Sequence, residues 1–448
     1  MPEQSLPRTL IVNFNAPELN QLALALTQAD RLERYVRPYV NKGRAWERAL
    51  AAMPLAGGLY GSTFGRRRMA DPALARLTLE AGVLPDVLAA IAMRLRPLPG
   101  ALRARWTNAL IKSLREAVAA SAERLATQAE CVVAYEGFAL PAFAARRAAG
   151  LGHNVLNYPI AHHRVRRRER LEEIERTPQF ASTWPDFDDW PAGHEQRLDD
   201  EIALADAVLV GSTYAADTFV AEGIPRSRMK VVPYGVDLDT FAPPAEGALA
   251  ARDGARFEAI FTGQLTQRKG LSYLLEGWRR FAPADARLTL VGQTVGDARA
   301  LAPWADLFRH VPHRTRPQLA RHYQTSDVFV FPTLVEGMPL VVLEAMACGL
   351  PVIVTANGPA DIVRDGVDGF VIPARDPDAI AARLETLYRD PALRAQMGRN
   401  ASRRAAEFGW PAYTDKVKAC LADLCASSRA AAPAPTGPLM QPGASLAP

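Results

Sequence analysis

The chain has 448 residues, of which 49% are hydrophobic and 23% charged, and its formal net charge is +5 at pH 7. These values exclude a fibrous or wholly disordered chain, and at roughly 100–200 residues per domain they indicate two domains. The four cysteines form no C-x-x-C pair, which excludes a disulfide framework or a cysteine metal centre and favours a reducing cytoplasm.

Apolar runs typical of strands alternate with helical patterns through the first half of the chain. The predicted elements are strands at 9–14, 130–135, 153–158 and 207–212, and helices at 139–149 and 214–222. The run at 207–212 is the last clear strand that this pattern predicts before a linker around 230–247. Because strands and helices alternate, we expect an α/β architecture with parallel sheets.

A second series of the same kind follows the linker. It predicts strands at 257–262, 288–292, 327–332 and 351–355, and helices at 271–281, 340–348 and 378–389. In the last of these helices Ile380, Leu384 and Leu387 recur at helical spacing, so we expect them to form one buried stripe.

Arginine clusters at 66–68 and 164–170 concentrate positive charge in the first half. Such clusters attract nucleic acid, anionic lipid or phosphorylated substrates, and a solvated arginine-rich surface is the alternative. Apolar segments such as 84–88 lie among the arginines of residues 40–105, which favours a face on a membrane surface. We expect no nucleic-acid partner, because neither aromatic–basic interleaving nor a helix-turn-helix pattern accompanies the clusters.

The strongest chemical signal is the segment 332–351. A strand ends at Pro332, a tight loop carries Glu336 and Gly337, and Pro339 begins a helix. A strand end, a glycine loop and a helix N-terminus together favour a bound phosphate, because free N–H groups and the helix dipole point at it. Ligands in open α/β sheets bind at this carboxyl edge of the strands.

Two carboxylates flank that phosphate site, Glu336 in the loop and Glu344 on the helix. Carboxylates are poor phosphate ligands, but they accept hydrogen bonds from vicinal hydroxyl groups. A ligand with hydroxyls on either side of a phosphate fits, which describes a nucleotide sugar. The alternative is a surface loop residue and a solvated helix residue. Glu344 lies in an apolar run, however, where an unpaired carboxylate is costly, so we expect it to have a partner.

The spacing of these two residues resembles the Glu-x7-Glu signature of the retaining glycosyltransferases with the GT-B fold, close to the family numbered four. The resemblance spans residues 205–405 and includes the loop 263–270 and the pieces 358–363, 366–371 and 233–237. It implies two Rossmann-like, doubly wound α/β domains that face each other across a cleft.

In that fold the expected boundaries follow the chain. They are an acceptor-side domain at 1–235, a nucleotide-sugar donor domain at 240–408, and a helix at 409–426 that crosses back. Residues 427–448, rich in Ala, Pro and Gly, are predicted to be a disordered tail.

The resemblance implies that Glu344 holds the ribose hydroxyls, Glu336 the donor sugar and Lys269 the pyrophosphate. A fixed cation there stabilises the charge that builds on the leaving group. The other donor-binding residues that it implies are Gly263, Gln264, Arg268, Gly337, Met338, Pro339 and Leu340. Gln264 stands where the family has an arginine, so that charge is lost. Arg268 is the candidate for replacing it, and a solvent-facing side chain is the alternative.

In the first half, His162 and His163 resemble the place where the family has a histidine facing the donor sugar, and only one can point inward. The alternative for each is an ordinary loop histidine. Glu136 is a candidate for acceptor contact or general base work, or a carboxylate that complements a helix start. The turn after the first strand has no glycine, so Asn13 and Asn15 are expected to offer amides at the cleft.

These features imply a glycosyltransferase that moves a sugar from a nucleotide-diphosphate sugar to a glycan or lipid-linked acceptor, with retained configuration. The expected setting is cell-surface polysaccharide or glycoconjugate synthesis in the cytoplasm, at the inner face of the membrane. No Asp-x-Asp motif stands in a useful context, so neither a metal nor another cofactor is expected. The alternatives are a non-catalytic GT-B scaffold and a nucleotide-sugar epimerase.

Overall fold

The computed structural model describes residues 6–53, 60–61, 64, 67–69, 71–92, 100–184, 193–244, 256–281 and 283–431. Arg66 of the first arginine cluster, part of the linker and residues 432–448 of the predicted tail lie outside them. Within the described residues, no helix combines the length and the apolar character that crossing a membrane requires.

The first sheet has seven parallel strands in its described part, in the order β3-β2-β1-β4-β5-β6-β7. Their bounds are β1 Thr9–Val12, β2 Leu32–Arg37, β3 Thr78–Glu80, β4 Cys131–Tyr135, β5 Asn154–Asn157, β6 Ala207–Val210 and β7 Met229–Val231. The sequence predicted β1, β4, β5 and β6. The prediction that 207–212 is the last strand of this half is wrong, because β7 follows it and pairs with β6.

The second sheet has six parallel strands in the described residues, in the order β10-β9-β8-β11-β12-β13. Their bounds are β8 Phe257–Thr262, β9 Ala286–Val291, β10 Phe308–Val311, β11 Val328–Phe331, β12 Val352–Thr355 and β13 Gly369–Ile372. β8 has the predicted limits. β10 and β13 were not predicted, because each has only four residues and β10 exposes two polar side chains.

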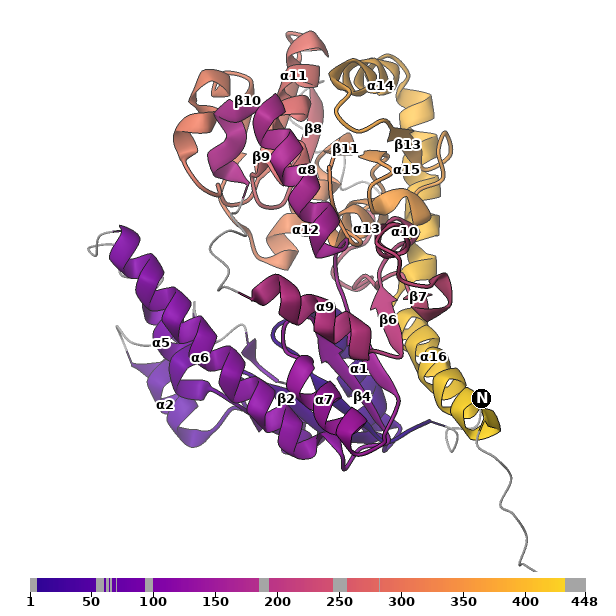
Figure 1. Ribbon diagram of the computed structural model, residues 1–448. Helices are drawn as coiled ribbons and strands as arrows, with labels where there is room; N and C mark the ends of the chain where they lie inside the picture. Colours follow the sequence, from indigo (N-terminus) through magenta and orange to yellow (C-terminus); the bar gives the residue numbers. More distant parts are fainter. Residues whose placement is uncertain are drawn as a thin grey trace, which may run out of the picture.

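Helices flank both sheets (Figure 1). In β1, Leu10 and Val12 pack with side chains of α6 and α7, whereas Ile11 packs with α1. Because successive side chains of a strand point to opposite faces, helices cover both faces of this sheet. The helices are α1 Pro17–Gln28, α2 Ala45–Ala52, α4 Pro72–Leu77, α5 Val83–Ala92, α6 Gly100–Ala126, α7 Leu140–Ala148, α8 His163–Arg176, α9 His194–Leu204, α10 Thr213–Ala221, α11 Leu271–Phe281, α12 Arg316–Gln324, α13 Leu340–Ala347, α14 Pro377–Arg389, α15 Pro391–Ala405 and α16 Trp410–Ala431.

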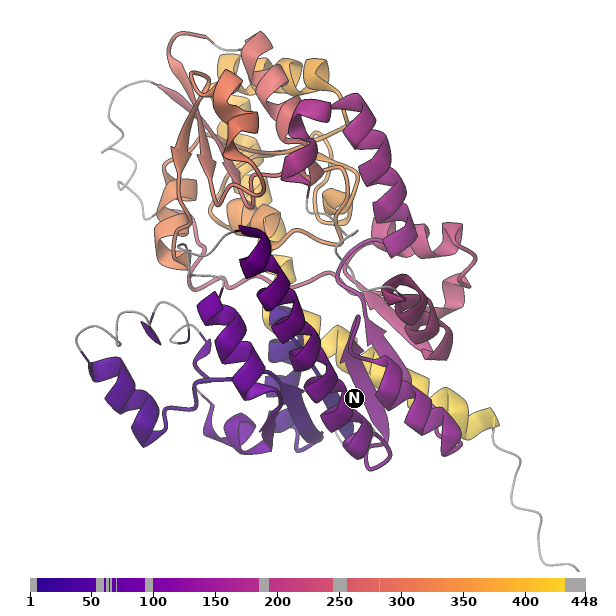
Figure 2. The same ribbon diagram turned by 60° about the vertical axis from the view of Figure 1, so that its left-hand side comes forward.

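The last helix connects the two sheet domains. α16 runs from the second domain alongside the first (Figures 1 and 2) and contacts α1. Tyr413 on α16 packs edge-on against Tyr234, with ring centroids 6.0 Å apart. The backbone N–H of Val236 donates to the carbonyl of Phe408 at 2.8 Å. The chain therefore passes between the domains twice at one place, once near Val236 and once through α16.

A segment that precedes the last strands of the first sheet lies against the second domain. It consists of α8 and the short 3-10 helix η3 (Pro178–Thr183), and Figure 1 shows α8 beside the second sheet. Thr183 Oγ1 accepts a hydrogen bond from the N–H of Gln267 at 3.0 Å, and Phe180 packs near Trp304. The two domains are thus joined by packing as well as by the linker.

Candidate functional site

One carboxylate and two cations meet at the carboxyl edge of the second sheet. Glu336 lies in the loop between β11 and α13, and Arg268 and Lys269 lie on η6 (Gln267–Lys269), which follows β8. Arg268 Nη1 donates to Glu336 Oε1 at 2.5 Å and to the carbonyl of Val335 at 2.8 Å. Lys269 Nζ donates to the same Oε1. The two loops meet because β8 and β11 are neighbouring parallel strands.

The charges of this cluster shift its pKa values. Burial would raise the pKa of Glu336, but Arg268 and Lys269 outweigh burial and hold the pKa below its usual value. Burial, together with Arg268, lowers the pKa of Lys269 to about 8, although Glu336 counteracts this. At neutral pH one carboxylate therefore faces two cations. The excess of positive charge in a mostly buried site suits a phosphate or diphosphate group.

The N-terminus of α13 lies directly after the loop that carries Glu336. Pro339 is the N-cap residue, whereas the sequence predicted it as the first residue of the helix, and no side chain caps this end. The N–H groups of the first turn, which begins at Leu340, therefore have no side-chain acceptor. They and the helix dipole favour an anion in the same place as the two cations.

The same loop contacts the first domain. A Cβ atom on Gly337 would lie 1.8 Å from the carbonyl oxygen of Pro159, so only glycine permits this close approach. Ser212 Oγ donates to the Gly337 carbonyl at 2.5 Å, and the N–H of Tyr234 donates to Sδ of buried Met338 at 2.8 Å. The loop is thereby fixed at the boundary between the two domains.

Glu344 lies further along α13 with its side chain 11% exposed. Burial raises its pKa to about 7, Arg316 counteracts this, and Asp237 adds to it. Arg316 Nη2 lies 3.9 Å from Glu344 Oε1 and 3.8 Å from Asp237 Oδ2. Arg316 is the partner that the sequence required without identifying it. The available signal was its position, since α12 begins at Arg316 shortly after β10, at the carboxyl edge of the sheet.

A pocket of about 470 Å³ lies at this edge. Its lining includes the predicted residues Gly263 and Gln264 after β8, Gly292 after β9, His313 after β10 and Val341 on α13. Its volume is in the range of small-molecule sites. The loops after three adjacent strands and the start of α13 therefore enclose one pocket, as the doubly wound architecture predicts. Gln264 is exposed, and Arg268 rather than Gln264 carries the positive charge beside Glu336.

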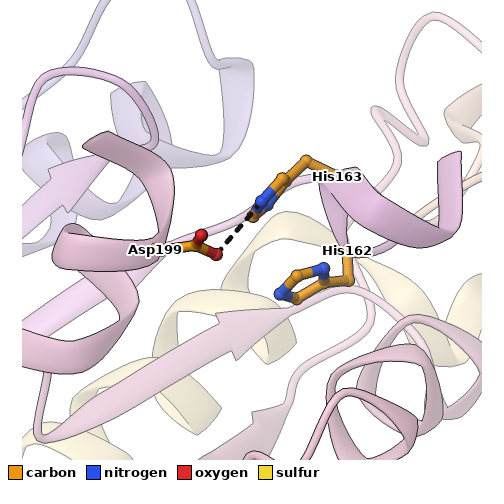
Figure 3. A group of neighbouring side chains, drawn as sticks. All are labelled: His162, His163 and Asp199. Atoms are coloured by element: carbon orange, nitrogen blue, oxygen red, sulfur yellow. Dashed lines mark ion pairs between the residues drawn. The ribbon is translucent and has the colours of Figure 1, made fainter. Parts of the chain in front are cut away.

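His162 and His163 are both buried in the first domain, and their rings stack with centroids 4.3 Å apart. His162 Nδ1 accepts a hydrogen bond from the N–H of Arg164 at 3.2 Å, which caps α8, and His163 points toward Asp199 on α9 (Figure 3). Burial above all lowers the pKa of each histidine to about 3, so both rings are neutral at pH 7. Within the described residues, no hydrogen bond or ion pair joins either ring to the Glu336 cluster.

The two histidines and Asp199 form a group that could hold a metal ion. Their ligand atoms lie within 4.8 Å of one another, and His163 Nε2 is 3.2 Å from Asp199 Oδ1. Neutral imidazoles and a carboxylate are the ligands of many zinc sites. Two features oppose a cation here. The group lies at the positive N-terminus of α8, and Arg164 Nη2 already donates to Asp199 Oδ2 at 2.6 Å.

The acceptor-side candidate Glu136 is enclosed in the first domain. Its side chain is 14% exposed, it pairs with Arg166 at 3.7 Å, and burial raises its pKa. The carboxylate that serves the start of α7 is Glu201, which the sequence did not single out. It accepts hydrogen bonds from three N–H groups between residues 137 and 140, at 2.6 to 3.1 Å.

The two asparagines after β1 have different positions. Asn13 is fully buried, its Oδ1 accepts from the N–H of Ala16 at 2.8 Å, and its Nδ2 donates to Tyr35 Oη at 2.7 Å. The expectation that Asn13 offers an amide at the cleft is therefore wrong, because these bonds close the turn after β1. Asn15 is exposed and lines a second pocket, on the first domain.

Comparison with protein families places this donor-side architecture in a known group. Residues 256–390, which contain Lys269, Glu336 and Glu344, match the family model described as "Glycosyl transferases group 1". The D-inositol 3-phosphate glycosyltransferase of Paenarthrobacter aurescens is 34% identical over 234 residues, which are 48% of this chain and 56% of that protein. The protein of the same name from Kineococcus radiotolerans is 35% identical over 225 residues, 43% of this chain and 51% of that protein. The chain thus spans about half the length of these curated relatives.

Solved structures extend the likeness to both domains. Sucrose-phosphate synthase from Thermosynechococcus elongatus superposes with a TM-score of 0.60 at 19% identity, covering 94% of this chain and 99% of that one. Anabaena HepE, solved in complex with UDP, superposes with a TM-score of 0.58 at 15% identity, covering 93% and 100%. At these identities the likeness establishes the fold, which is GT-B as the sequence predicted.

Proposed function

Residues 256–390 belong to the group 1 glycosyl transferases, and from this premise we propose that the protein transfers a sugar from a nucleotide-diphosphate sugar to an acceptor hydroxyl. The acceptor oxygen bonds to the anomeric carbon as the bond from that carbon to the phosphate oxygen breaks. The hydroxyl proton passes to the leaving phosphate, so the products are a glycoside and a nucleoside diphosphate.

The observation that carries this proposal is the placing of Lys269 and Arg268 beside Glu336, at the N-terminus of α13. Negative charge builds on the diphosphate as the glycosyl bond breaks, and two fixed cations and free N–H groups stabilise it. Glu344, on the same helix, is placed to accept hydrogen bonds from ribose. We propose that Glu336 accepts hydrogen bonds from the sugar, with Arg268 supplying the charge that Gln264 lacks.

We further propose that the transfer retains the anomeric configuration. Glu336 is bound by two cations, which makes it a poor nucleophile, so the acceptor is expected to enter on the face that the diphosphate leaves. That route places the acceptor hydroxyl near the phosphate oxygen that takes its proton. It needs no metal ion, because Lys269 and Arg268 neutralise the leaving group, and we propose that none takes part.

For the acceptor we propose a glycan or lipid-linked molecule, used at a membrane face in cell-surface polysaccharide or glycoconjugate synthesis. The support is a set of exposed apolar side chains on α2, α5 and α6, which extend from the first domain in Figure 1. The largest are Trp46, Leu84, Leu88, Ile91 and Trp106. Exposed Arg48 and Arg105 lie among them, a combination that suits an anionic bilayer surface.

The decisive experiment is calorimetric titration of the wild type and of Glu344→Ala with UDP, GDP and ADP. UDP is the first choice, because HepE is solved with it. We expect one nucleotide to bind, and the variant to lose about 1–3 kcal/mol of binding free energy, the cost of an unmade charged hydrogen bond. Absence of binding by all three would leave a non-catalytic scaffold as the better description. Binding and sugar conversion without any acceptor would favour an epimerase.

A further inference from the structure

We propose that a pocket on the first domain binds a phosphate group of the acceptor through Arg37 and Arg68. The pocket has a volume of about 630 Å³ and lies between α1 and residues 67–74. Arginine and amide side chains dominate its polar lining. These are Asn15, Asn20, Gln21, Arg37, Arg67 and Arg68. This assignment rests on the proposed function only in naming the ligand as the acceptor, since the phosphate site is defined by its own residues.

Arg37 is the residue that most requires a ligand. It ends β2, is 7% exposed, and donates from Nη1 to Asn20 Oδ1 at 2.7 Å. Its Nε is buried and has no hydrogen-bond partner, and within the described residues no carboxylate pairs with it. A buried cation without a counter-charge is costly, and a phosphate in the adjoining pocket would remove that cost.

The neighbouring charges decide where an anion fits. Arg67 is paired with Asp86, which neutralises it. Arg68 is exposed, and within the described residues it forms no ion pair. Asp71 also lines the pocket, but it is engaged as the N-cap of α4, where it accepts from the N–H of Leu74 at 2.7 Å. Positive charge therefore exceeds negative charge around the pocket, and Arg37 and Arg68 are its two uncompensated cations.

The shape and position of the pocket indicate the class of ligand. Guanidinium groups pair with phosphate oxygens through two parallel hydrogen bonds, and the amides of Asn15 and Gln21 suit hydroxyl groups. Arg37 and Asn15 lie at the carboxyl ends of β2 and β1. Pro159 and Ser212, which contact the donor loop, follow β5 and β6 at the same edge. The structure therefore points to a hydroxylated, phosphate-bearing acceptor bound on the donor side of the first domain.

The test is calorimetric titration with inorganic phosphate in the presence of saturating UDP, which fills the phosphate site at α13. Wild type is compared with Arg37→Gln, Arg68→Gln and Arg76→Gln. Arg76 is the matched control, an exposed arginine on α4 outside the pocket lining. We expect phosphate affinity to fall about tenfold or more in the first two variants, the effect of losing a charged hydrogen bond, and to stay unchanged in Arg76→Gln. Because Arg68 is exposed, Arg68→Gln tests the site even if Arg37→Gln fails to fold.

A second titration, with vesicles containing phosphatidylglycerol, distinguishes a lipid phosphate from a soluble one. Loss of vesicle binding in Arg68→Gln but not in Arg76→Gln would assign the pocket to a lipid-borne phosphate. Lost inorganic phosphate binding with unchanged vesicle binding would assign it to a soluble acceptor. Equal affinities of wild type, Arg37→Gln and Arg68→Gln for both probes would overturn the phosphate site. UDP binding, measured in the same samples, reports separately on the donor site, so failure of the proposed function would be visible on its own.

Discussion

Arg375, in the second domain, forms ion pairs with Glu173 at 2.9 Å and Glu169 at 2.6 Å, both on α8 in the first half of the chain. Arg375 has a φ of 62°, which is uncommon for a residue other than glycine, and its surroundings must therefore hold it there. Glu173 is fully buried and also accepts from Gln267 Nε2 at 2.7 Å. Gln267 is on η6, beside Arg268, so the contact between domains reaches the donor cluster.

Replacing Arg375 by Met is expected to destabilise the protein by about 2–4 kcal/mol, because it leaves the Glu173 carboxylate buried without a cation. Unfolding by urea, followed by tryptophan fluorescence, measures the change. The matched control is Arg280→Met, whose partner Asp378 is 82% exposed, and which should cost less than about 1 kcal/mol. Equal unfolding midpoints for the two variants would show that the Arg375 contact does not hold the domains together.

Lys269→Met is expected to lower the turnover rate about 10²- to 10³-fold, because one of the two cations at the leaving diphosphate is lost. The measurement is release of nucleoside diphosphate, with Arg280→Met as a control that should match the wild type. A turnover rate within about twofold of the wild type would remove Lys269 from the proposed mechanism.

The pH dependence gives a separate test of Lys269. Burial first, and then Arg268, lowers its pKa to about 8, so the charged form is lost as pH rises through that value. We therefore expect kcat/KM of the wild type to fall above about pH 8, since this ratio reports the free enzyme. The alkaline fall should be absent from the residual activity of Lys269→Met. If both proteins show the same fall, another group is responsible for it.

The sequence predicted elements well wherever the pattern is local. Ile380, Leu384 and Leu387 form the fully buried stripe expected of α14, and α11 has the limits that its periodicity predicted. β2 was not predicted, because charged residues interrupt its apolar pattern. β7 has only three residues, so its signal was too short to separate from a linker.

The candidate site divides in the same way. The meeting of Lys269 with Glu336 was predictable, because their loops follow parallel strands whose carboxyl ends share an edge. The pairing of Arg375 with Glu173 was not, because the two residues are 202 positions apart and meet only through the docking of two domains. The burial of His162 and His163 was also beyond local pattern, since it depends on how α8 packs against α9 and α10.

Removing metal ions with EDTA is expected to leave turnover unchanged, because Lys269 and Arg268 neutralise the diphosphate. Elemental analysis of the purified protein provides a second measurement, directed at His162, His163 and Asp199. We expect no stoichiometric metal there, since Arg164 pairs with Asp199. Stoichiometric zinc that is lost in His163→Gln would contradict this, and activity that EDTA removes and a divalent cation restores would contradict the metal-free mechanism.

The last prediction separates a binding role of Glu344 from a structural one. Burial raises its folded pKa from 4.5 to about 7, so the folded state holds more protons than the unfolded state between those values, and stability should fall as pH rises through that range. Glu344→Gln removes this loss. We expect the variant to be about 1–3 kcal/mol more stable than the wild type at pH 8, with the difference vanishing near pH 4. Glu385→Gln, on the surface of α14, is the control and should follow the wild-type profile.

The same Glu344→Gln variant should bind UDP about tenfold more weakly, because a neutral amide is a poorer acceptor for the ribose hydroxyls than a carboxylate. A residue that lowers stability at neutral pH and strengthens ligand binding is characteristic of a functional site rather than of a packing contact. Unfolding curves from pH 4 to pH 8 and one UDP titration measure both effects. If the variant were less stable at pH 8 and bound UDP normally, Glu344 would be a structural partner of Arg316, and the ribose would have to be held elsewhere.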